Sequence, residues 1–210
     1  MSLTLSPKFP RCGERPIGLY PCVTTLAWIE RLAPLGIDSI QLYCDDALDL
    51  LRIIAPAKRY CEQYRIRLFI HRHWQIALEH GVYGVHVEAC ELAQVDLNEL
   101  QQAKLRLGIT VEDSNSFCDI LPLGPSYIAL NPVFRTHPVK QSQLEDLAYL
   151  CQQEDVPIVA AGGINMGNID RVLACQPDGV AIEREICQNA HPELTTQRLL
   201  ARLHVAQLAV

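Results

Sequence analysis

The tripeptide His71-Arg72-His73 places two imidazoles next to a guanidinium, directly after an apolar run at 66–71. Alternate residues of an extended chain share one face, so both imidazoles could be presented to one metal ion of the Zn²⁺ type. The donors that could complete such a site follow the next apolar run: Glu88, Cys90 and Glu91. The alternative is that His71 and Arg72 stand where a related protein carries different ligand-binding residues.

Composition excludes several classes of protein. The 210 residues carry a formal net charge of −6 and no long basic run, which argues against nucleic acid as a partner. No apolar stretch is long enough to span a membrane, and residues 1–16 lack the apolar core of a signal peptide. The nine cysteines are dispersed without a CxxC pair, so we expect reduced thiols and a cytoplasmic protein.

Eight short apolar runs, most of them rich in Val and Ile, are typical of parallel strands buried on both faces. They lie at 18–23, 37–43, 66–71, 82–87, 105–110, 126–131, 156–162 and 179–183. Segments of helical period separate or follow them, at 24–36, 45–64, 143–153, 168–175 and 190–210. The segment 112–124 is a poor helix, which predicts a short or irregular crossover after the fifth strand.

This alternation of strand and helix predicts the α/β class and a closed (β/α)₈ barrel; an open doubly wound sheet is the alternative. We expect one domain over 1–210, with the core at about 18–187, an N-terminal extension at 1–17 and a C-terminal helix at 190–210. In such a barrel the chemistry sits on loops after the carboxyl ends of the strands. His71 and Arg72 are therefore predicted to lie on the functional rim.

The sequence resembles thiamine-phosphate synthase and its tautomerase relative TenI. The resemblance covers about residues 18–187 and is carried by "GLYPCVTTLAWIERLAPLGIDSIQL", "YGVHV", "LRLGIT", "PSYIALNPVFRT", "PIVAAGGI" and "DGVAIEREI". It implies a (β/α)₈ barrel that is usually dimeric. The implied reaction is a transferase reaction of thiamine biosynthesis, in which hydroxymethylpyrimidine diphosphate joins a thiazole phosphate and pyrophosphate leaves with the help of Mg²⁺.

The diphosphate motifs of the family are replaced in this chain. The motif Q-[LF]-R-x-K after the second strand keeps Gln41 as a candidate substrate ligand, but Tyr43 and Asp45 replace its arginine and lysine. The family's Asn-Asp after the third strand, whose aspartate is a magnesium ligand, becomes His71-Arg72.

After the fourth strand, the motif G-Q-E-D becomes Glu88-Ala89-Cys90-Glu91. Only Glu91 keeps an acid in place as a candidate metal ligand, so the resemblance implies a Mg²⁺ site of which little remains.

Charge magnitudes indicate what these replacements do. A diphosphate carries about three negative charges, and each contact with a cation near 6 Å is worth roughly 3 kcal/mol at an effective dielectric constant near 20. Asp45 in place of a lysine turns this attraction into repulsion. We therefore expect the family reaction to be weak or lost, unless cations on the same rim compensate. Those cations are Arg72, Arg135, Lys140 and Arg184.

The phosphate half of the site is better preserved. The candidate phosphate ligands are Thr136, which survives from the family motif after the sixth strand, the pair Gly162-Gly163, and Arg184. A glycine pair allows backbone N–H groups to approach a phosphate, and barrels commonly bind phosphate near strands seven and eight. The predicted partner is a small phosphorylated ligand, thiazole phosphate or one similar to it.

The candidate catalytic residues are Thr110, which keeps the hydroxyl of the family motif S-x-H, His137, and Lys140, which stands one residue later than the family lysine. Three functions stay open: a weakened synthase, a thiazole tautomerase that moves a proton through His137 or Glu112, and a non-catalytic barrel that binds a small ligand.

Other residues have structural interpretations. We expect His86 to be a hydrogen-bonded structural histidine, His73 to face solvent, and Trp28 and Trp74 to pack under helices. The acids that could cap helix N-termini are Asp45, Asp46, Glu112 and Asp113.

Overall fold

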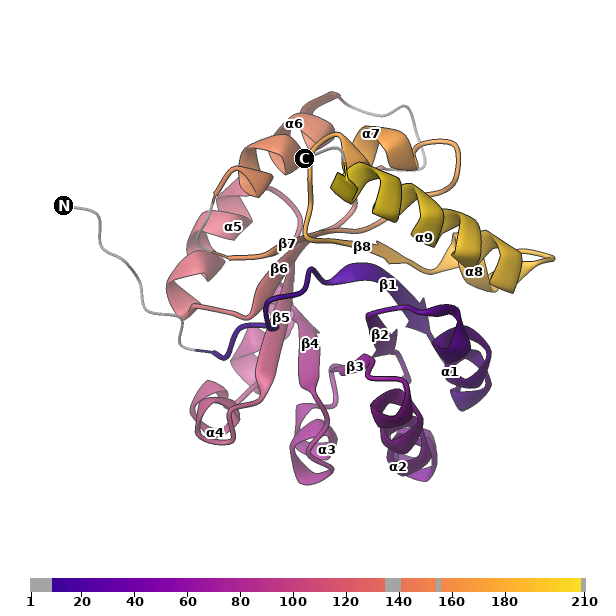
Figure 1. The fold of residues 1–210 in the computed structure, drawn as a ribbon. Helices are drawn as coiled ribbons and strands as arrows, with labels where there is room; N and C mark the ends of the chain where they lie inside the picture. Colours follow the sequence, from indigo (N-terminus) through magenta and orange to yellow (C-terminus); the bar gives the residue numbers. More distant parts are fainter. Residues whose placement is uncertain (1–8, 135–140, 154–155, 209–210) are drawn as a thin grey trace.

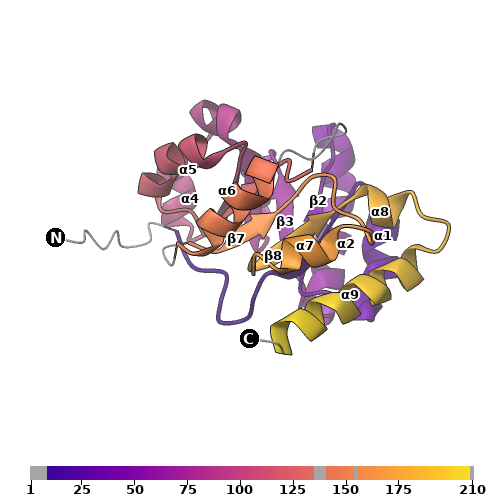
Figure 2. The same cartoon turned by 90° about the horizontal axis from the view of Figure 1, so that it is seen from above.

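The computed structural model describes residues 9–134, 141–153 and 156–208, and its strands close into a parallel barrel in sequence order (Figures 1 and 2). The strands are β1 Gly18–Val23, β2 Ser39–Leu42, β3 Arg67–His71, β4 Gly84–Glu88, β5 Arg106–Val111, β6 Tyr127–Leu130, β7 Ile158–Ala160 and β8 Gly179–Ile182. β1 pairs with β8 as well as with β2, which closes the sheet. The predicted barrel is confirmed, and the open sheet is excluded.

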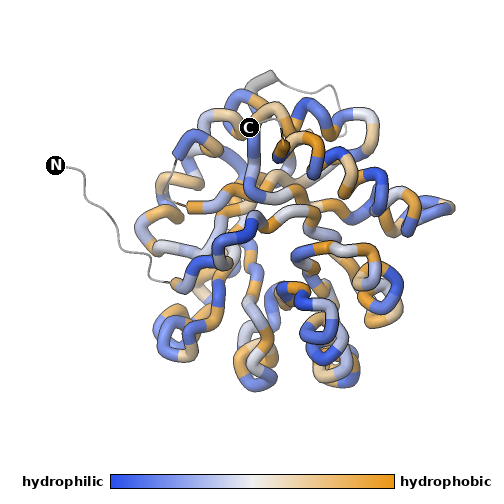
Figure 3. Tube along the Cα trace, in the orientation of Figure 1, coloured by the Kyte–Doolittle hydropathy of each residue, from blue (hydrophilic) through white to orange (hydrophobic). Residues whose placement is uncertain are grey.

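Helices connect consecutive strands and cover the outside of the barrel (Figure 1). They are α1 Leu26–Leu32, α2 Ala47–Gln63, α3 Trp74–Glu79, α4 Leu97–Gln102, α5 Ser114–Ile120, α6 Gln141–Cys151, α7 Ile169–Leu173, α8 Arg184–Cys187 and α9 Pro192–Leu208. Hydrophobic and hydrophilic residues alternate around them (Figure 3), as in helices that bury one face on a sheet. Within the described ranges, no helix has both the length and the apolarity that crossing a membrane requires.

The crossover after β5 is short, as predicted, but it is helical. Asp113 accepts a hydrogen bond from the backbone N–H of Ser116 and thereby caps α5, and a 3₁₀ turn at Leu121–Leu123 continues the segment. Asp46 caps α2 in the same way, through the N–H groups of Leu48 and Asp49. Capping by Asp113 supports α5 despite the weak helical pattern of the residues that follow it.

Large aromatic rings fill the interior of the barrel. Tyr20, Phe69 and Tyr127 are fully buried and meet edge to face, with the rings of Phe69 and Tyr127 5.2 Å apart. Glycines on the neighbouring strands make room for them: a Cβ on Gly108 would lie 2.1 Å from the Tyr127 ring, and one on Gly84 2.6 Å from Phe69. This layer forms the floor on which the side chains of the barrel mouth stand.

The opposite end of the barrel is closed by the segment before β1. Arg67 is buried, and its guanidinium donates to the backbone oxygens of five residues, Cys12, Arg15, Pro16, Ile17 and Asp38. These bonds satisfy a buried cation with carbonyl oxygens alone. Access to the interior is therefore from the carboxyl ends of the strands.

Candidate binding site in the barrel mouth

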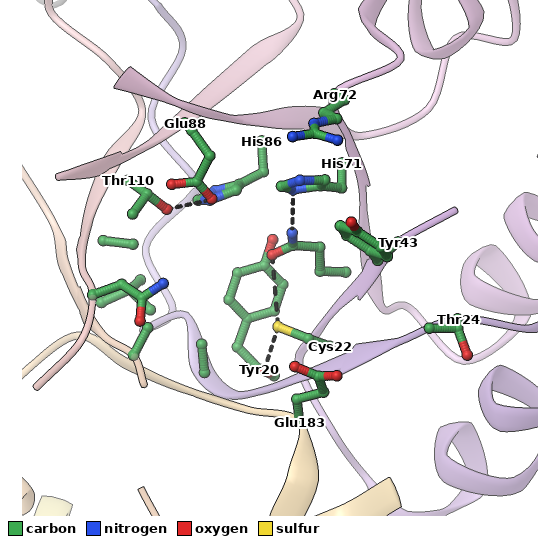
Figure 4. A pocket seen from close by; sticks show the side chains of 16 residues that line it. Tyr20, Cys22, Thr24, Tyr43, His71, Arg72, His86, Glu88, Thr110 and Glu183 are labelled. Carbon is green, nitrogen blue, oxygen red and sulfur yellow. Dashed lines mark hydrogen bonds between the residues drawn. The ribbon is translucent and has the colours of Figure 1, made fainter. Parts of the chain in front are cut away.

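A pocket of about 470 Å³ opens at the carboxyl ends of the strands, where all eight contribute side chains (Figure 4). Its lining alternates along each strand, as inward-facing residues must. The lining consists of Tyr20, Cys22, Thr24, Gln41, Tyr43, His71, Arg72, His86, Glu88, Thr110, Ala129, Asn131, Val159, Ala161, Ala181 and Glu183. The pocket lies where active sites of (β/α)₈ barrels are found.

A chain of hydrogen bonds runs from the floor of the pocket to its wall. The hydroxyls of Tyr20 and Tyr127 are 2.9 Å apart, Tyr127 Oη is 2.7 Å from Nδ1 of His86, and Nε2 of His86 is 2.7 Å from Oγ1 of Thr110. Burial lowers the pKa of His86 to about 3, because the imidazolium would be cut off from water. His86 is therefore neutral at pH 7, and its predicted role as a hydrogen-bonded histidine is borne out by these contacts.

His71 stands beside His86 on the neighbouring strand, with ring centroids 5.9 Å apart in a stacked arrangement. Its Nδ1 is 2.9 Å from Nε2 of Gln41, whose Oε1 accepts a hydrogen bond from the thiol of Cys22. The Tyr43 ring covers His71 at 4.6 Å. Burial lowers the pKa of His71 to about 4, so both imidazoles are uncharged at neutral pH.

Glu88 completes a cluster with the two histidines. Burial raises the pKa of its carboxyl group, and the nearby Glu91 raises it further. The ligating atoms of His71, His86 and Glu88 all lie within 4.8 Å of one another. Figure 4 shows the three side chains side by side at the mouth.

The charges around the mouth are mostly negative. Arg72 supplies the guanidinium of the lining, and its Nε donates to Oε1 of Glu91, so this cation is already paired. Glu88 and Glu183 are the carboxylates of the lining, and Asp45 at the rim accepts a hydrogen bond from the Tyr43 hydroxyl. Among the residues that the structure describes, the pocket lining offers a polyanion two carboxylates and one arginine that is already paired.

These residues do not fit the magnesium site that the resemblance implies. Of the two positions at which it places acidic ligands, one carries Arg72 and the other carries Glu91, which accepts the hydrogen bond from Arg72. A guanidinium repels a divalent cation, and it occupies the oxygens that Mg²⁺ would need. We therefore assign no step of any reaction to Mg²⁺ at this place.

The corner between β7 and β8 differs from the rest of the mouth. Gly162 and Gly163 have φ angles of +85° and +70°, and a Cβ on either would meet the segment 131–134 at 2.3 Å, so both must be glycine. Their backbone N–H groups make no hydrogen bond to any described residue. Arg184 begins α8 after β8, is exposed, and forms no ion pair within the described ranges. The corner thus offers donors without an opposing carboxylate partner of their own.

The alternative in which His71 and His73 share one metal ion is not supported by the structure, because His73 does not belong to the cluster of possible ligands around His71. Arg72 has a positive φ angle of 65°, and this turn sends His73 away from the barrel axis. His73 precedes α3, and its Nε2 is 2.8 Å from the backbone oxygen of Cys44. It is partly buried, so the expectation that it faces solvent is also wrong. The neighbour of His71 in space is His86, which sequence spacing did not indicate.

The other predicted residues are divided between three places. Gln41, Tyr43, His71, Arg72 and Thr110 line the pocket. Asp45, Glu91, Gly162, Gly163 and Arg184 lie around it without lining it. Thr136, His137 and Lys140, together with Arg135, lie outside the described residues. Trp28 and Trp74 pack against the core as expected, and Glu112 is exposed outside the pocket.

Sequence reasoning missed Cys22 as a pocket residue and did not group Glu88 with His86, whereas Asn131 and Glu183 were expected at the strand ends but given no role. The signal was available in the alternation of residues along each strand. Glu88 follows His86 by two places and therefore shares its inward face.

The chain was compared with known proteins. A model of the family described as thiamine monophosphate synthase matches residues 20–186. The thiamine-phosphate synthase of Yersinia pestis (strain Pestoides F) is 38% identical over 211 residues, covering 97% of this chain and 98% of that protein. The thiamine-phosphate synthase of Klebsiella pneumoniae is 39% identical over 206 residues, covering 93% and 95%.

Solved structures share the fold. The thiamine phosphate pyrophosphorylase from Pyrococcus furiosus superposes with a TM-score of 0.80 at 20% identity, over 90% of this chain and 96% of that one. The 3-hexulose-6-phosphate synthase from Salmonella typhimurium gives a TM-score of 0.67 at 16% identity, over 90% and 99%. At sequence identities this low, the structural similarity supports the barrel fold alone.

Proposed function

The chain belongs to the thiamine monophosphate synthase family, and from this membership we propose that it binds a small phosphorylated ligand, such as thiazole phosphate, while its coupling to a pyrimidine diphosphate is weak or lost. The pairing of Arg72 with Glu91, beside the carboxylates of Glu88 and Glu183, is the observation that carries this proposal. A pyrophosphate leaving group is stabilised chiefly by cations placed against it. Here the guanidinium of the lining already has its counter-ion.

Burial strengthens the argument. The Glu91 side chain is only 17% exposed, whereas that of Arg72 is 47% exposed. The carboxylate of this ion pair is therefore shielded from water, while part of the guanidinium stays in contact with it. An incoming diphosphate would have to displace Glu91 and leave that half-buried carboxylate without its partner. It would also approach Asp45, which stands where the family has a lysine. Both effects oppose binding.

The β7–β8 corner supports the retained half of the proposal. The N–H groups of Gly162 and Gly163, which make no hydrogen bond to a described residue, form the kind of backbone donor set that holds phosphate oxygens. Arg184 begins α8 after β8 and can donate two parallel hydrogen bonds to one phosphate group. A monophosphate carries less charge than a diphosphate and is therefore less affected by the carboxylates at β2–β4.

Isothermal titration calorimetry separates the two halves of this proposal. Thiazole phosphate is titrated alone, and pyrimidine diphosphate is titrated with Mg²⁺ in a second experiment. Saturable heat from thiazole phosphate only is the expected result. Binding of both ligands supports an active synthase, and binding of neither contradicts a thiamine-related ligand.

A thiazole tautomerase is the second candidate, and Glu88 is the observation that favours it. A half-buried carboxyl group whose pKa is raised by burial inside a pocket is suited to accept and return a proton. Exchange of a carbon-bound proton of thiazole phosphate with D₂O, followed by NMR, tests this activity. Loss of exchange in Glu88→Gln supports the tautomerase, whereas binding without exchange leaves a non-catalytic barrel.

Further expectations from the sequence remain predictions. They are a single domain over 1–210, a homodimer and a cytoplasmic location. Light scattering coupled to size exclusion tests the dimer directly.

A further inference from the structure

His71, His86 and Glu88 bring two imidazoles and one carboxylate together at one side of the barrel mouth, with all ligating atoms within 4.8 Å of one another. We propose that these three side chains bind one divalent transition-metal ion of the Zn²⁺ class. The site differs in residues and chemistry from the magnesium positions that the resemblance implies, which carry Arg72 and Glu91 here. It does not depend on the ligand assigned to the β7–β8 corner.

The donor set selects the class of metal. Imidazole nitrogens suit Zn²⁺, Co²⁺, Ni²⁺ and Fe²⁺, whereas Mg²⁺ prefers oxygen ligands alone. Two histidines and one carboxylate are also the ligand set of catalytic zinc sites that keep an open coordination position. The pocket lies directly in front of the three side chains (Figure 4), so an open position would face the space in which a ligand binds.

The distances require a modest contraction. Ligand bonds of about 2.1 Å place tetrahedral donors about 3.4 Å apart, compared with the 4.8 Å within which the three donors now lie. His71 and His86 stand on adjacent paired strands, and their rings are held nearly parallel at 24°. Glu88 is the longer and more flexible side chain, so its carboxylate can move to close the site.

Hydrogen bonds behind the imidazoles are of the kind that supports metal ligands. Tyr127 Oη is 2.7 Å from Nδ1 of His86 and can accept a hydrogen bond from an Nδ1–H group, which leaves Nε2 as a ligand. Because the hydroxyls of Tyr20, Tyr127 and Thr110 can each donate or accept, the same distances serve either tautomer of His86. With a metal bound at Nε2, Thr110 would give up its bond to this nitrogen and could donate to Glu88, which lies opposite it on the paired strand.

His71 has an equivalent partner in Gln41. The Gln41 amide faces Nδ1 at 2.9 Å, and turning this amide presents its oxygen to an Nδ1–H group, which frees Nε2 for the metal. The thiol of Cys22, now bonded to Gln41 Oε1, then faces the amide nitrogen as an acceptor. Each imidazole is thus oriented by a side chain, Tyr127 or Gln41, that can act either as hydrogen-bond donor or as acceptor.

The surrounding charges favour a cation. Arg72 is neutralised by Glu91, and the carboxylates of Glu183 and Asp45 lie at the same mouth. The arrangement that repels a diphosphate therefore attracts a divalent metal ion. A bound metal would hold Glu88 as a ligand, so Zn²⁺ should suppress any proton exchange that depends on this carboxylate.

Titration of the chelator-treated full chain with Zn²⁺ at pH 7, by calorimetry, tests the proposal. One saturable site per chain is the expected result. Co²⁺ is used in parallel because its visible spectrum reports nitrogen and oxygen ligands, whereas thiolate ligands add a strong near-ultraviolet band. That comparison matters in a chain with nine free cysteines.

The variants are His71→Asn and Glu88→Gln, which keep a polar side chain of similar size at each position. Each should weaken Zn²⁺ binding by at least about tenfold, since each removes one of three ligands. The matched controls are His73→Asn, the histidine that turns away from the site, and His191→Asn on the surface. Both should bind Zn²⁺ like the unsubstituted chain, and circular dichroism confirms that all four are folded.

Three results would overturn the proposal: no saturable Zn²⁺ binding, unchanged affinity in both His71→Asn and Glu88→Gln, or a thiolate band in the cobalt spectrum. An equal loss of Zn²⁺ affinity in His73→Asn and His71→Asn would also contradict the proposal, because it would indicate that His71 and His73 bind the metal together. Because the titration uses metal alone, a failure here leaves the thiazole phosphate proposal untouched.

Discussion

Arg72 at the end of β3 donates a hydrogen bond to Glu91 in the turn that follows β4, and this contact neutralises the guanidinium that lines the barrel mouth. The pair links two positions at which the family resemblance places magnesium ligands. Arg72 therefore removes one of the implied metal ligands, and its hydrogen bond to Glu91 occupies the other. The mouth is left with the carboxylates of Glu88 and Glu183 facing the pocket.

Restoring the lost cations should restore affinity for a diphosphate. In Tyr43→Arg/Asp45→Lys, two cations replace an aromatic ring and a carboxylate at the end of β2, so binding of inorganic pyrophosphate with Mg²⁺ should strengthen by at least about tenfold. Calorimetry measures the affinity. Asn115→Arg/Asp119→Lys on the exposed face of α5 makes the same change of three charge units away from the mouth and should have no such effect. Equal gains in both variants would mean that net charge alone, and not position, governs binding.

Arg184 should matter for the phosphorylated ligand. Arg184→Ala removes the guanidinium beside the glycine turn, and thiazole phosphate should bind about tenfold more weakly, equivalent to about 1.4 kcal/mol. Arg198→Ala is the matched control, because Arg198 is exposed on α9 and forms no ion pair within the described ranges. If Arg184→Ala binds thiazole phosphate as tightly as the unsubstituted chain, the phosphate group does not bind at the β7–β8 corner.

Much of the fold could be predicted from the sequence because buried parallel strands leave a strong local pattern. All eight runs contain the observed strands or overlap them closely, although β7 keeps only Ile158–Ala160 of the run at 156–162. The short helices α3, α4 and α8 were not predicted, because 4 to 6 residues show a helical period only weakly, although the equally short α7 lies within the predicted segment 168–175.

The candidate site was predicted less well, for a physical reason. Strand ends could be located, so Gln41, Tyr43, His71 and Thr110 were correctly placed at the mouth. Which side chains meet depends on the register between strands, and register is not visible in a single sequence. The pairing of His71 with His86 follows from that register, whereas the separation of His73 from His71 follows from the positive φ angle of Arg72.

The Tyr127 hydroxyl should support both stability and the proposed metal site. Tyr127→Phe leaves the buried Tyr20 hydroxyl and Nδ1 of His86 without this partner, which should lower the free energy of unfolding by about 1–3 kcal/mol. Zn²⁺ affinity should fall by roughly 10-fold or more, because the bond that orients His86 is gone. Urea denaturation and zinc calorimetry measure the two effects.

Tyr149→Phe is the control for this change, since Tyr149 is 55% exposed on α6. It should alter neither quantity. If Tyr127→Phe keeps full zinc affinity, the hydrogen bond to His86 does not orient a ligand.

Gly108 should be irreplaceable, because Tyr127 occupies the space of its missing side chain. In Gly108→Ala the new Cβ would lie 2.1 Å from the ring, so the aromatic floor must shift and the free energy of unfolding should fall by about 1–3 kcal/mol or more. Gly167→Ala meets only the flexible side chain of Asn165, at 3.1 Å, and should change stability by about 0.5 kcal/mol or less. Thermal or urea unfolding measures the stability of both variants. An equal loss in the free energy of unfolding would contradict the packing of Tyr127 against Gly108.

The central claim is that the mouth has lost its cationic hold on a diphosphate, and the rate of thiamine phosphate formation tests it most directly. The purified chain is assayed with pyrimidine diphosphate, thiazole phosphate and Mg²⁺ beside the 38% identical synthase of Yersinia pestis. The initial rate should be lower than that of the Yersinia protein by at least about a hundredfold, the loss typical of removing one group that stabilises developing charge. A rate within a few-fold of the Yersinia protein would contradict the claim.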